Sequence, residues 1–247
     1  MRITFLGTSH GVPSKERYCS ATLVEVNGSN YLIDCGAPVA ELLIKNGINF
    51  STLKSVFITH SHGDHTYGLS TLCSLASWYF RKSDFDVYFP EKCTADAFEQ
   101  LITVCDKIFN KDRIRFKTFE AGVVLSDENI KVTAIATKHM NNGEYPSFAF
   151  MLEAEGKRVF FTGDLYKDPS VDFPSEAKQL TSELIICEMA HFSSEAILPI
   201  ITQCPTKRIY FNHIYYDYEK SLAAIKDADQ QFEQEIIAVN DGDVFEI

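Results

Sequence analysis

The chain has 247 residues, of which 34 are Asp or Glu and 23 are Lys or Arg, so its formal net charge is −11. A hydrophobic fraction of 45% and a charged fraction of 23% are typical of a globular protein and exclude a mainly disordered or fibrous chain. An acidic chain repels phosphates, which argues against a large nucleic-acid partner. No apolar run approaches the roughly 18–20 residues that cross a bilayer, and the apolar stretch after Met1 is too short for a signal peptide. We therefore expect a cytoplasmic protein with no membrane partner.

The seven cysteines are odd in number and form no Cys-x-x-Cys pair. They lie in apolar segments such as Leu184–Cys187. This distribution predicts buried free thiols in a reducing compartment, and it gives little support to a zinc knuckle or a disulfide framework.

Strand-like and helix-like segments alternate along the first half of the chain. The expected strands are Ile3–Leu6, Ala21–Val26, Tyr31–Ile33, Ser55–Thr59, Val87–Phe89 and Ile130–Thr137. The expected helices are Val39–Lys45, Tyr67–Phe80 and Thr94–Phe109. Asn27–Asn30 predicts a hairpin turn, and Asn46-Gly47 predicts the end of the first helix.

The second half continues this alternation. The expected strands are Phe148–Glu153, Arg158–Thr162, Leu184–Cys187, Arg208–Phe211 and Ile236–Val239. Helices are expected at Ser194–Ile201 and Glu219–Lys226, a hairpin turn at Glu155-Gly156, and a turn at Asn240–Asp243 before a last short strand. The chain has no repeat and no linker-like tract, so we expect a single domain over residues 1–247, with sheet packed between helical layers.

The segment Ile58–His65 carries the strongest chemical signal in the sequence. Three of the seven histidines, His60, His62 and His65, fall within six residues together with Asp64. Imidazole and carboxylate groups together are ligands of Zn²⁺ and related divalent ions. His60 and His62 point to the same side of an extended segment, and Gly63 permits a bend that swings the next two ligands to a second position. One loop could therefore serve two adjacent metal ions.

Further polar residues follow predicted strands directly. They are Asp34, His139, Asp164, Glu188 and His213. Ligand sites in open α/β sheets gather outside the carboxyl ends of the strands. We therefore expect these residues to share one edge with the histidine cluster.

The pattern His60, His62, Asp64, His65, then His139, Asp164 and His213, resembles the signature of the metallo-β-lactamase superfamily. The resemblance spans nearly the whole chain and implies an α+β fold, the four-layer αβ/βα sandwich with two mixed β-sheets between helical layers. It also implies a binuclear site in which one metal is held by His60, His62 and His139. The second would be held by Asp64, His65 and His213, with Asp164 bridging. Flavo-diiron relatives typically carry Glu at the position of His62, so a hydrolytic site is favoured over a redox site.

The opening stretch Phe5–Arg17 and the triplet Asp34-Cys35-Gly36 resemble ribonuclease Z and its phosphodiesterase relatives. This resemblance implies that Asp34 orients a ligand histidine. Glu188-Met189-Ala190-His191 is loosely similar to the segment in which a Glu and a His protonate the leaving group of ribonuclease Z, and a solvated loop histidine is the alternative. Ribonuclease Z usually carries a tRNA-binding arm between the equivalents of His139 and Asp164, where this chain has room only for a hairpin.

Four basic residues alternate with other residue types at Lys111, Arg113, Arg115 and Lys117. As a strand, this segment would present one basic face. Such a face serves either as an RNA footprint or as the solvent face of an edge strand, and the second interpretation is favoured because charges there discourage pairing.

The sequence thus predicts a metal-dependent hydrolase acting on a phosphodiester or a small anionic ester. A hydroxide held between two divalent cations would attack, with Asp64 orienting it, while His191 and Glu188 serve the leaving group. The expected cations are Zn²⁺, with Mn²⁺, Fe²⁺ or Ni²⁺ as alternatives. A lactonase or thioesterase, a ribonuclease Z-like RNA-processing nuclease and a non-catalytic metal-binding module remain open alternatives. The expected partner is a small anionic molecule, and the oligomeric state is open, a homodimer included.

Overall fold

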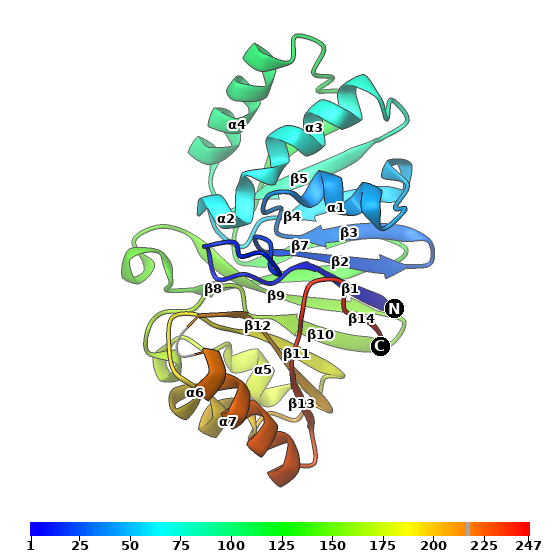
Figure 1. The fold of residues 1–247 in the computed structure, drawn as a ribbon. Helices are drawn as coiled ribbons and strands as arrows, with labels where there is room; N and C mark the ends of the chain where they lie inside the picture. The colour runs from blue at the N-terminus through cyan, green and yellow to red at the C-terminus, as the bar shows by residue number, and fades with distance from the viewer. Residues whose placement is uncertain (216–217) are drawn as a thin grey trace. The chain divides into compact units, whose positions relative to one another are not determined.

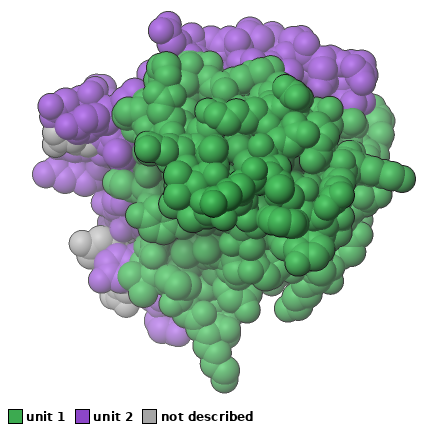
Figure 2. Space-filling view, turned by 90° about the horizontal axis from the view of Figure 1, so that it is seen from above, with its two compact units in different colours: residues 1–119, 241–246 green, residues 120–240, 247 purple. Residues whose placement is uncertain are grey.

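The computed structural model describes residues 1–215 and 218–247, the side chains of residues 141 and 142 excepted. Within it, the chain divides into two compact units (Figure 2). Unit 1 comprises residues 1–119 and 241–246, and unit 2 comprises residues 120–240 and 247. That both belong to a single domain over residues 1–247 stays a prediction.

Unit 1 contains a mixed seven-stranded sheet with the order β14-β1-β2-β3-β4-β5-β6. Its strands are β1 (Arg2–Gly7), β2 (Ala21–Val26), β3 (Ser29–Ile33), β4 (Leu53–Phe57), β5 (Phe85–Phe89), β6 (Ile114–Thr118) and β14 (Val244–Glu246). The pairs from β14 to β3 are antiparallel, and those from β3 to β6 are parallel. The carboxyl ends of β1, β3, β4 and β5 therefore meet at the same edge.

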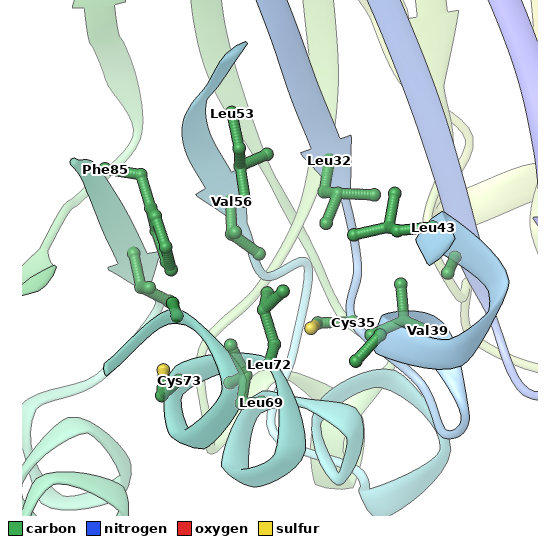
Figure 3. Close-up of a cluster of buried hydrophobic side chains, with 14 of the residues drawn as sticks. Leu32, Cys35, Val39, Leu43, Leu53, Val56, Leu69, Leu72, Cys73 and Phe85 are labelled. Carbon is green, nitrogen blue, oxygen red and sulfur yellow. The ribbon is translucent and has the colours of Figure 1, made fainter. Parts of the chain in front are cut away.

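The helices of unit 1 pack on its sheet (Figure 1). They are α1 (Val39–Lys45), the short α2 (Gly63–Thr66), α3 (Gly68–Trp78) and α4 (Lys92–Cys105), with a 3₁₀ turn η1 (Phe50–Thr52). The buried positions of α3 recur at helical spacing, at Leu69, Leu72, Cys73 and Ala76. These side chains meet Val56 and Phe85 of the sheet in the core of this unit (Figure 3).

Residues from the far end of the chain also hold unit 1 together. Strand β14 pairs with β1. Asp241, which precedes it, accepts hydrogen bonds from the Thr8 hydroxyl and the Tyr18 N–H, both at 2.6 Å. The loop after β1 is thus fastened by a carboxylate 233 residues away from Thr8.

Unit 2 contains a second mixed seven-stranded sheet, with the order β13-β12-β11-β10-β9-β8-β7. Its strands are β7 (Gly122–Ser126), β8 (Lys131–Thr137), β9 (Ser147–Ala154), β10 (Lys157–Phe161), β11 (Leu184–Met189), β12 (Arg208–Ile214) and β13 (Glu235–Ala238). The pairs from β7 to β10 are antiparallel, and those from β10 to β13 are parallel. The carboxyl ends of β8, β10, β11 and β12 therefore share one edge.

The helices of unit 2 complete its core. They are α5 (Ser175–Gln179), α6 (Ser194–Ile201) and α7 (Tyr218–Gln231), with 3₁₀ turns η2 (Met140–Gly143) and η3 (Pro169–Val171). Ile197 of α6 and Ile225 of α7 are buried against Ile209, Phe211 and Ile236 of the sheet. In the part of the chain that the structure describes, no helix has the length and apolarity that a membrane crossing requires.

Both predicted hairpins form, and one is shorter than expected. Asn27 and Gly28 have φ values of 51° and 74°, and Glu155 and Gly156 have 54° and 73°, as type I′ turns require. The predicted four-residue turn Asn27–Asn30 is therefore a two-residue turn. Ser29 already pairs with Val26, because the primed turn matches the twist of the two strands.

Other boundaries differ from the sequence prediction. The helix expected over Thr94–Phe109 ends at Cys105. Strand β7 was not predicted, because its sequence Gly-Val-Val-Leu-Ser does not alternate between buried and exposed residues and Val123 is 60% exposed at the edge of the sheet. Between His139 and Asp164 the chain forms only η2, β9 and β10, so the arm-free arrangement expected from the sequence is confirmed.

Candidate metal centre

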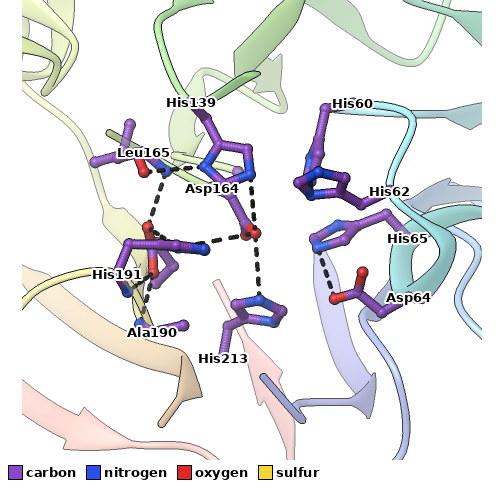
Figure 4. Close-up of polar contacts among 12 residues, drawn as sticks. His60, His62, Asp64, His65, His139, Asp164, Leu165, Ala190, His191 and His213 are labelled. Carbon is purple, nitrogen blue, oxygen red and sulfur yellow. Dashed lines mark hydrogen bonds and ion pairs between the residues drawn. The ribbon is translucent and has the colours of Figure 1, made fainter. Parts of the chain in front are cut away.

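The histidine cluster of unit 1 lies in the loop that follows β4. His60 is buried, His62 is exposed at the start of α2, and α2 itself carries Asp64 and His65 (Figure 4). A Cβ at Gly63 would lie 2.4 Å from the exposed ring of Tyr67, which would have to move aside to admit a side chain. Gly63 leaves room for the Tyr67 ring at the start of α2, and the helical turn that follows carries Asp64 and His65, the last two residues of the motif.

The donor atoms of this loop are paired at ligand spacing. His60 Nε2 lies 3.0 Å from His62 Nδ1, and His65 Nε2 lies 3.3 Å from Asp64 Oδ2. Ligands placed about 2.0–2.2 Å from a metal ion are about 2.8–3.1 Å apart in an octahedral and about 3.3–3.6 Å apart in a tetrahedral arrangement. Both pairs match this spacing, so their donor set fits a divalent ion.

Asp34, 3% exposed at the end of β3, supports this loop from behind. It accepts hydrogen bonds from the Thr59 N–H at 2.8 Å and lies 2.7 Å from His65 Nδ1. Because Nδ1 is held in this way, His65 presents Nε2 to Asp64. The contact to a motif histidine is the one that the resemblance implied for Asp34.

Glu91 holds the same loop from the side of α4. Its carboxylate accepts hydrogen bonds from the hydroxyls of Ser61 and Thr94, each at 2.8 Å. Partial burial raises the pKa of Glu91, but the hydrogen bonds from Ser61, Thr94 and Cys93 outweigh it and lower the pKa overall. Glu91 therefore stays ionised and anchors the residue between His60 and His62.

Unit 2 carries the other predicted ligands at the carboxyl ends of its strands. Asp164, which is 4% exposed, has its Oδ2 3.3 Å from His213 Nε2 and 3.8 Å from His139 Nε2 (Figure 4). The same oxygen lies 3.9 Å from His191 Nδ1, so three imidazoles surround one carboxylate oxygen, which suits a bridging ligand. Burial lowers the pKa of His139 despite the nearby Asp164 carboxylate, which favours the neutral imidazole that metals bind.

His213 reaches this position through an unusual backbone conformation. Its φ of 51° lies in the left-handed region, which few residues other than glycine adopt. The pairing register between β11 and β12 shifts at the same point, where Glu188 pairs with Asn212 and Met189 with Ile214. Such strained residues concentrate at functional sites, where the surrounding structure holds them in place.

Glu188 and His191 form a hydrogen-bonded pair. The Glu188 carboxylate, 2% exposed, lies 2.9 Å from His191 Nδ1 and accepts backbone N–H bonds from Leu165 and Ala190 at 2.8 and 2.6 Å. With both oxygens engaged, Glu188 joins its own loop to the loop that carries Leu165. The His191 side chain is 33% exposed, so one edge of its imidazole reaches solvent while Nδ1 is held by Glu188. His191 is therefore not a freely solvated loop histidine.

Most of the basic segment is ion-paired within unit 1. Lys111 pairs with Glu99, Arg115 with Asp84 and Asp86, and Lys117 with Asp86, while Arg113 donates to the carbonyls of Arg81 and Ser83. Only Ile114–Thr118 is a strand, and it is the edge strand β6. The arrangement agrees with the solvent face of an edge strand and leaves little free charge for RNA.

Sequence reasoning missed two carboxylates that support the ligand loops, Glu91 and Asp172. Neither belongs to the histidine motif, and their contacts are with hydroxyls and backbone N–H groups from other segments. No sequence signal marks such contacts, because the partners meet only in the folded chain.

Comparisons with known proteins agree with this fold. The chain aligns over its whole length with human tRNase Z, short form (ELAC1), at a TM-score of 0.78 and 21% identity, covering 99% of that chain. It also aligns over its whole length with a diphosphatase from the PhnP family, at a TM-score of 0.73 and 17% identity, covering 97% of that chain. The expected α+β metallo-β-lactamase sandwich, with two mixed sheets flanked by helices, is thereby confirmed.

Sequence relatives lead to the same class. The chain is 32% identical over 160 residues to ribonuclease Z of Shouchella clausii (strain KSM-K16), covering 64% of this chain and 49% of that protein. It thus spans about half the length of such curated relatives.

The fold is that of the metallo-β-lactamase superfamily, and the sequence relatives are ribonuclease Z proteins, so the chain resembles the ribonuclease Z branch, as the sequence predicted. Within that class, the family model described as "Anti-Pycsar protein Apyc1" matches residues 1–233. The chain therefore belongs to this family.

Proposed function

We propose that this protein is a metal-dependent hydrolase that cleaves a phosphodiester or a small anionic ester at a binuclear site. The observation that carries the proposal is the ligand spacing of the donor pairs, His60–His62 and Asp64–His65 in unit 1 and Asp164–His213 in unit 2. The relatives named ribonuclease Z and diphosphatase support a reaction at phosphorus.

The proposed ligands form two sets that follow the superfamily pattern. His60, His62 and His139 would hold one ion, Asp64, His65 and His213 the other, and Asp164 would bridge the two. We propose zinc, because a set of imidazoles with few carboxylates suits a borderline ion, with Mn²⁺, Fe²⁺ or Ni²⁺ as alternatives. Bound cations of this kind supply Lewis acidity and a hydroxide near neutral pH.

Three residues of the chain would then orient the attacking group and protonate the leaving group. The second Asp64 oxygen orients the attacking group. His191, whose Nδ1 is held by Glu188, delivers a proton from its other ring nitrogen to the leaving oxygen. The Glu188 carboxylate stabilises the protonated ring and fixes its orientation, and is a positioning residue.

A direct assay tests this proposal. Purified protein supplied with Zn²⁺ or Mn²⁺ should hydrolyse bis-p-nitrophenyl phosphate, and His62→Ala should lower the rate at least about 100-fold because it removes one ligand. Asp96→Asn, an exposed residue on α4, is the matched control and should keep full activity. Undiminished activity in His62→Ala would refute the assignment of the site.

RNA processing is the second candidate, favoured by the identity to ribonuclease Z. The short segment between His139 and Asp164, the net charge of −11 and the ion pairs of Lys111, Arg115 and Lys117 argue against it. A panel that pairs small phosphodiesters with a tRNA precursor, a lactone and a thioester separates the alternatives. Cleavage of the tRNA precursor alone would favour the nuclease.

We also propose that the protein works in the cytoplasm on a small anionic partner. The support is its set of seven cysteines, which suits a reducing compartment. Light scattering during size-exclusion chromatography gives the oligomeric state, for which a homodimer is one outcome.

A further inference from the structure

Asp172 is a buried carboxylate that joins two ligand loops of unit 2. It follows the 3₁₀ turn η3 and is 7% exposed. One oxygen, Oδ1, accepts a hydrogen bond from the Lys138 N–H, and the other, Oδ2, accepts one from the Tyr166 N–H, both at 2.7 Å. Lys138 directly precedes His139, and Tyr166 lies two residues after Asp164. A single side chain thus spans the two loops that carry these ligands.

The same two loops are joined a second time through Leu165. Its carbonyl oxygen lies 3.1 Å from His139 Nδ1, and its N–H donates to Glu188 Oε1 at 2.8 Å. Together with the bonds to Asp172, these contacts form a closed network of hydrogen bonds. It links His139 to Leu165, and it links Tyr166 through Asp172 back to Lys138. A change at Asp172 would therefore shift His139 Nε2 relative to Asp164 Oδ2, two atoms now 3.8 Å apart.

Burial of this carboxylate is costly, and the contacts show what offsets the cost. Among the residues that the structure describes, its hydrogen-bonding partners are backbone N–H groups, and no Lys or Arg side chain forms an ion pair with it. Two short charge-assisted bonds compensate for the lost hydration only while both N–H groups stay in place. The carboxylate and the two loops therefore fix one another.

We propose that Asp172 is a positioning residue of the metal centre, which sets the separation of His139 and Asp164 and so the affinity of the proposed centre for its ions. The inference rests on the proposed function and deepens it. Asp172 is the counterpart in unit 2 of Asp34 in unit 1, which likewise joins the residue before a ligand, Thr59, to a second point of the ligand loop.

The test uses zinc titration of the metal-free full-length protein against a chromophoric chelator. Asp172→Asn keeps the size of the side chain but turns an amide NH₂ group toward one of the two N–H donors. We expect it to weaken zinc binding about 10–100-fold, as loss of an outer-shell partner does. Asp172→Glu keeps two acceptor oxygens and should restore part of the affinity. The matched control is Asp168→Asn on the same turn, where the exposed carboxylate accepts hydrogen bonds from the Ser170 N–H and hydroxyl, and this variant should bind zinc like the wild type.

Amide hydrogen exchange adds a readout that needs no metal. In metal-free Asp172→Asn, the Lys138 and Tyr166 amides should exchange at least about tenfold faster, while the amides of β13 keep their protection. Wild-type zinc affinity in Asp172→Asn overturns the proposal, and so does an equal loss in Asp168→Asn. If Asp172→Asn shows no cooperative unfolding transition, the role of Asp172 is purely structural and the proposal is overturned. Failure of the wild type itself to bind zinc would instead refute the proposed function.

Discussion

At the scale of single residues, close backbone packing beneath Asp64 limits what the site tolerates. A Cβ at Gly36 would lie 2.2 Å from the Asp64 carbonyl oxygen and 2.7 Å from the Cys19 Cβ. We expect Gly36→Ala to lower the free energy of unfolding by at least about 3 kcal/mol, because backbone atoms must move to make room. Gly156→Ala is the control. A Cβ added there would meet no atom within 4 Å outside the neighbouring residues, so the loss of unfolding free energy should be about 1 kcal/mol, the cost of placing alanine in a left-handed backbone conformation. Urea titration measures both, and equal losses would contradict the prediction.

The cysteines provide a second prediction at this scale. Burial raises the pKa of the Cys35, Cys187 and Cys19 thiols, and it raises that of Cys204 to about 11. Cys93 and Cys105 are exposed. We expect a thiol reagent at pH 8 to label two cysteines in the native protein and all seven in denaturant, as counted by mass spectrometry. Fast native labelling of Cys35 or Cys187 would contradict their burial.

The sequence predicted the candidate metal ligands more readily than the residues that support them. His60, His62, Asp64 and His65 were recognisable because metal-binding residue types cluster at short spacing. His139 needed the added information that it follows a strand. Asp172 could not be predicted, because its partners are backbone N–H groups, which every residue except proline carries.

At the scale of elements, the bounds of two short helices were predicted best. The expected bounds of Val39–Lys45 and Ser194–Ile201 are confirmed without change. Helix α4 was predicted too long, because the apolar residues up to Phe109 continue beyond the point where Asp106 leaves the helical conformation. There the apolar pattern reflects packing of the following loop, since Phe109 contacts Phe116.

Helix α4 also depends on very few buried side chains. Its fully buried residues are Ala95 and Ile102, and the neighbouring Leu101 is 50% exposed. Ile102→Ala should cost about 2–4 kcal/mol of unfolding free energy through lost burial and a residual cavity. Leu101→Ala, the same helix and a similar loss of side-chain volume, should stay within about 0.5 kcal/mol. Thermal denaturation of the two variants side by side checks the difference, and similar shifts would contradict it.

At the scale of the whole molecule, metal removal should lower stability. An ion that binds only the folded chain stabilises it by about 2.7 kcal/mol at a concentration 100 times its dissociation constant. We therefore expect EDTA to lower the Tm of the wild type by several degrees. The shift should be smaller in His65→Ala, which lacks one proposed ligand. An identical Tm with and without EDTA in the zinc-loaded wild type would count against a bound ion.

The predicted single domain leads to a further expectation. Each unit has its own sheet and core, yet unit 1 contains residues from both ends of the chain. If units 1 and 2 form one domain, calorimetry should show one cooperative transition whose van't Hoff and calorimetric enthalpies agree. Two resolved transitions would instead assign the units to separate domains.

The fastening of the loop after β1 by Asp241 has a consequence for how the protein is made. Thr8 and Tyr18 leave the ribosome long before their partner, since 233 residues separate Thr8 from Asp241. During synthesis the sheet of unit 1 can pair from β1 to β6, but its edge next to β1 stays uncovered until β14 emerges. The loop that bears Gly11, whose added Cβ would lie 3.3 Å from the Asp64 carboxylate, is thus one of the last parts of the molecule to acquire its final form.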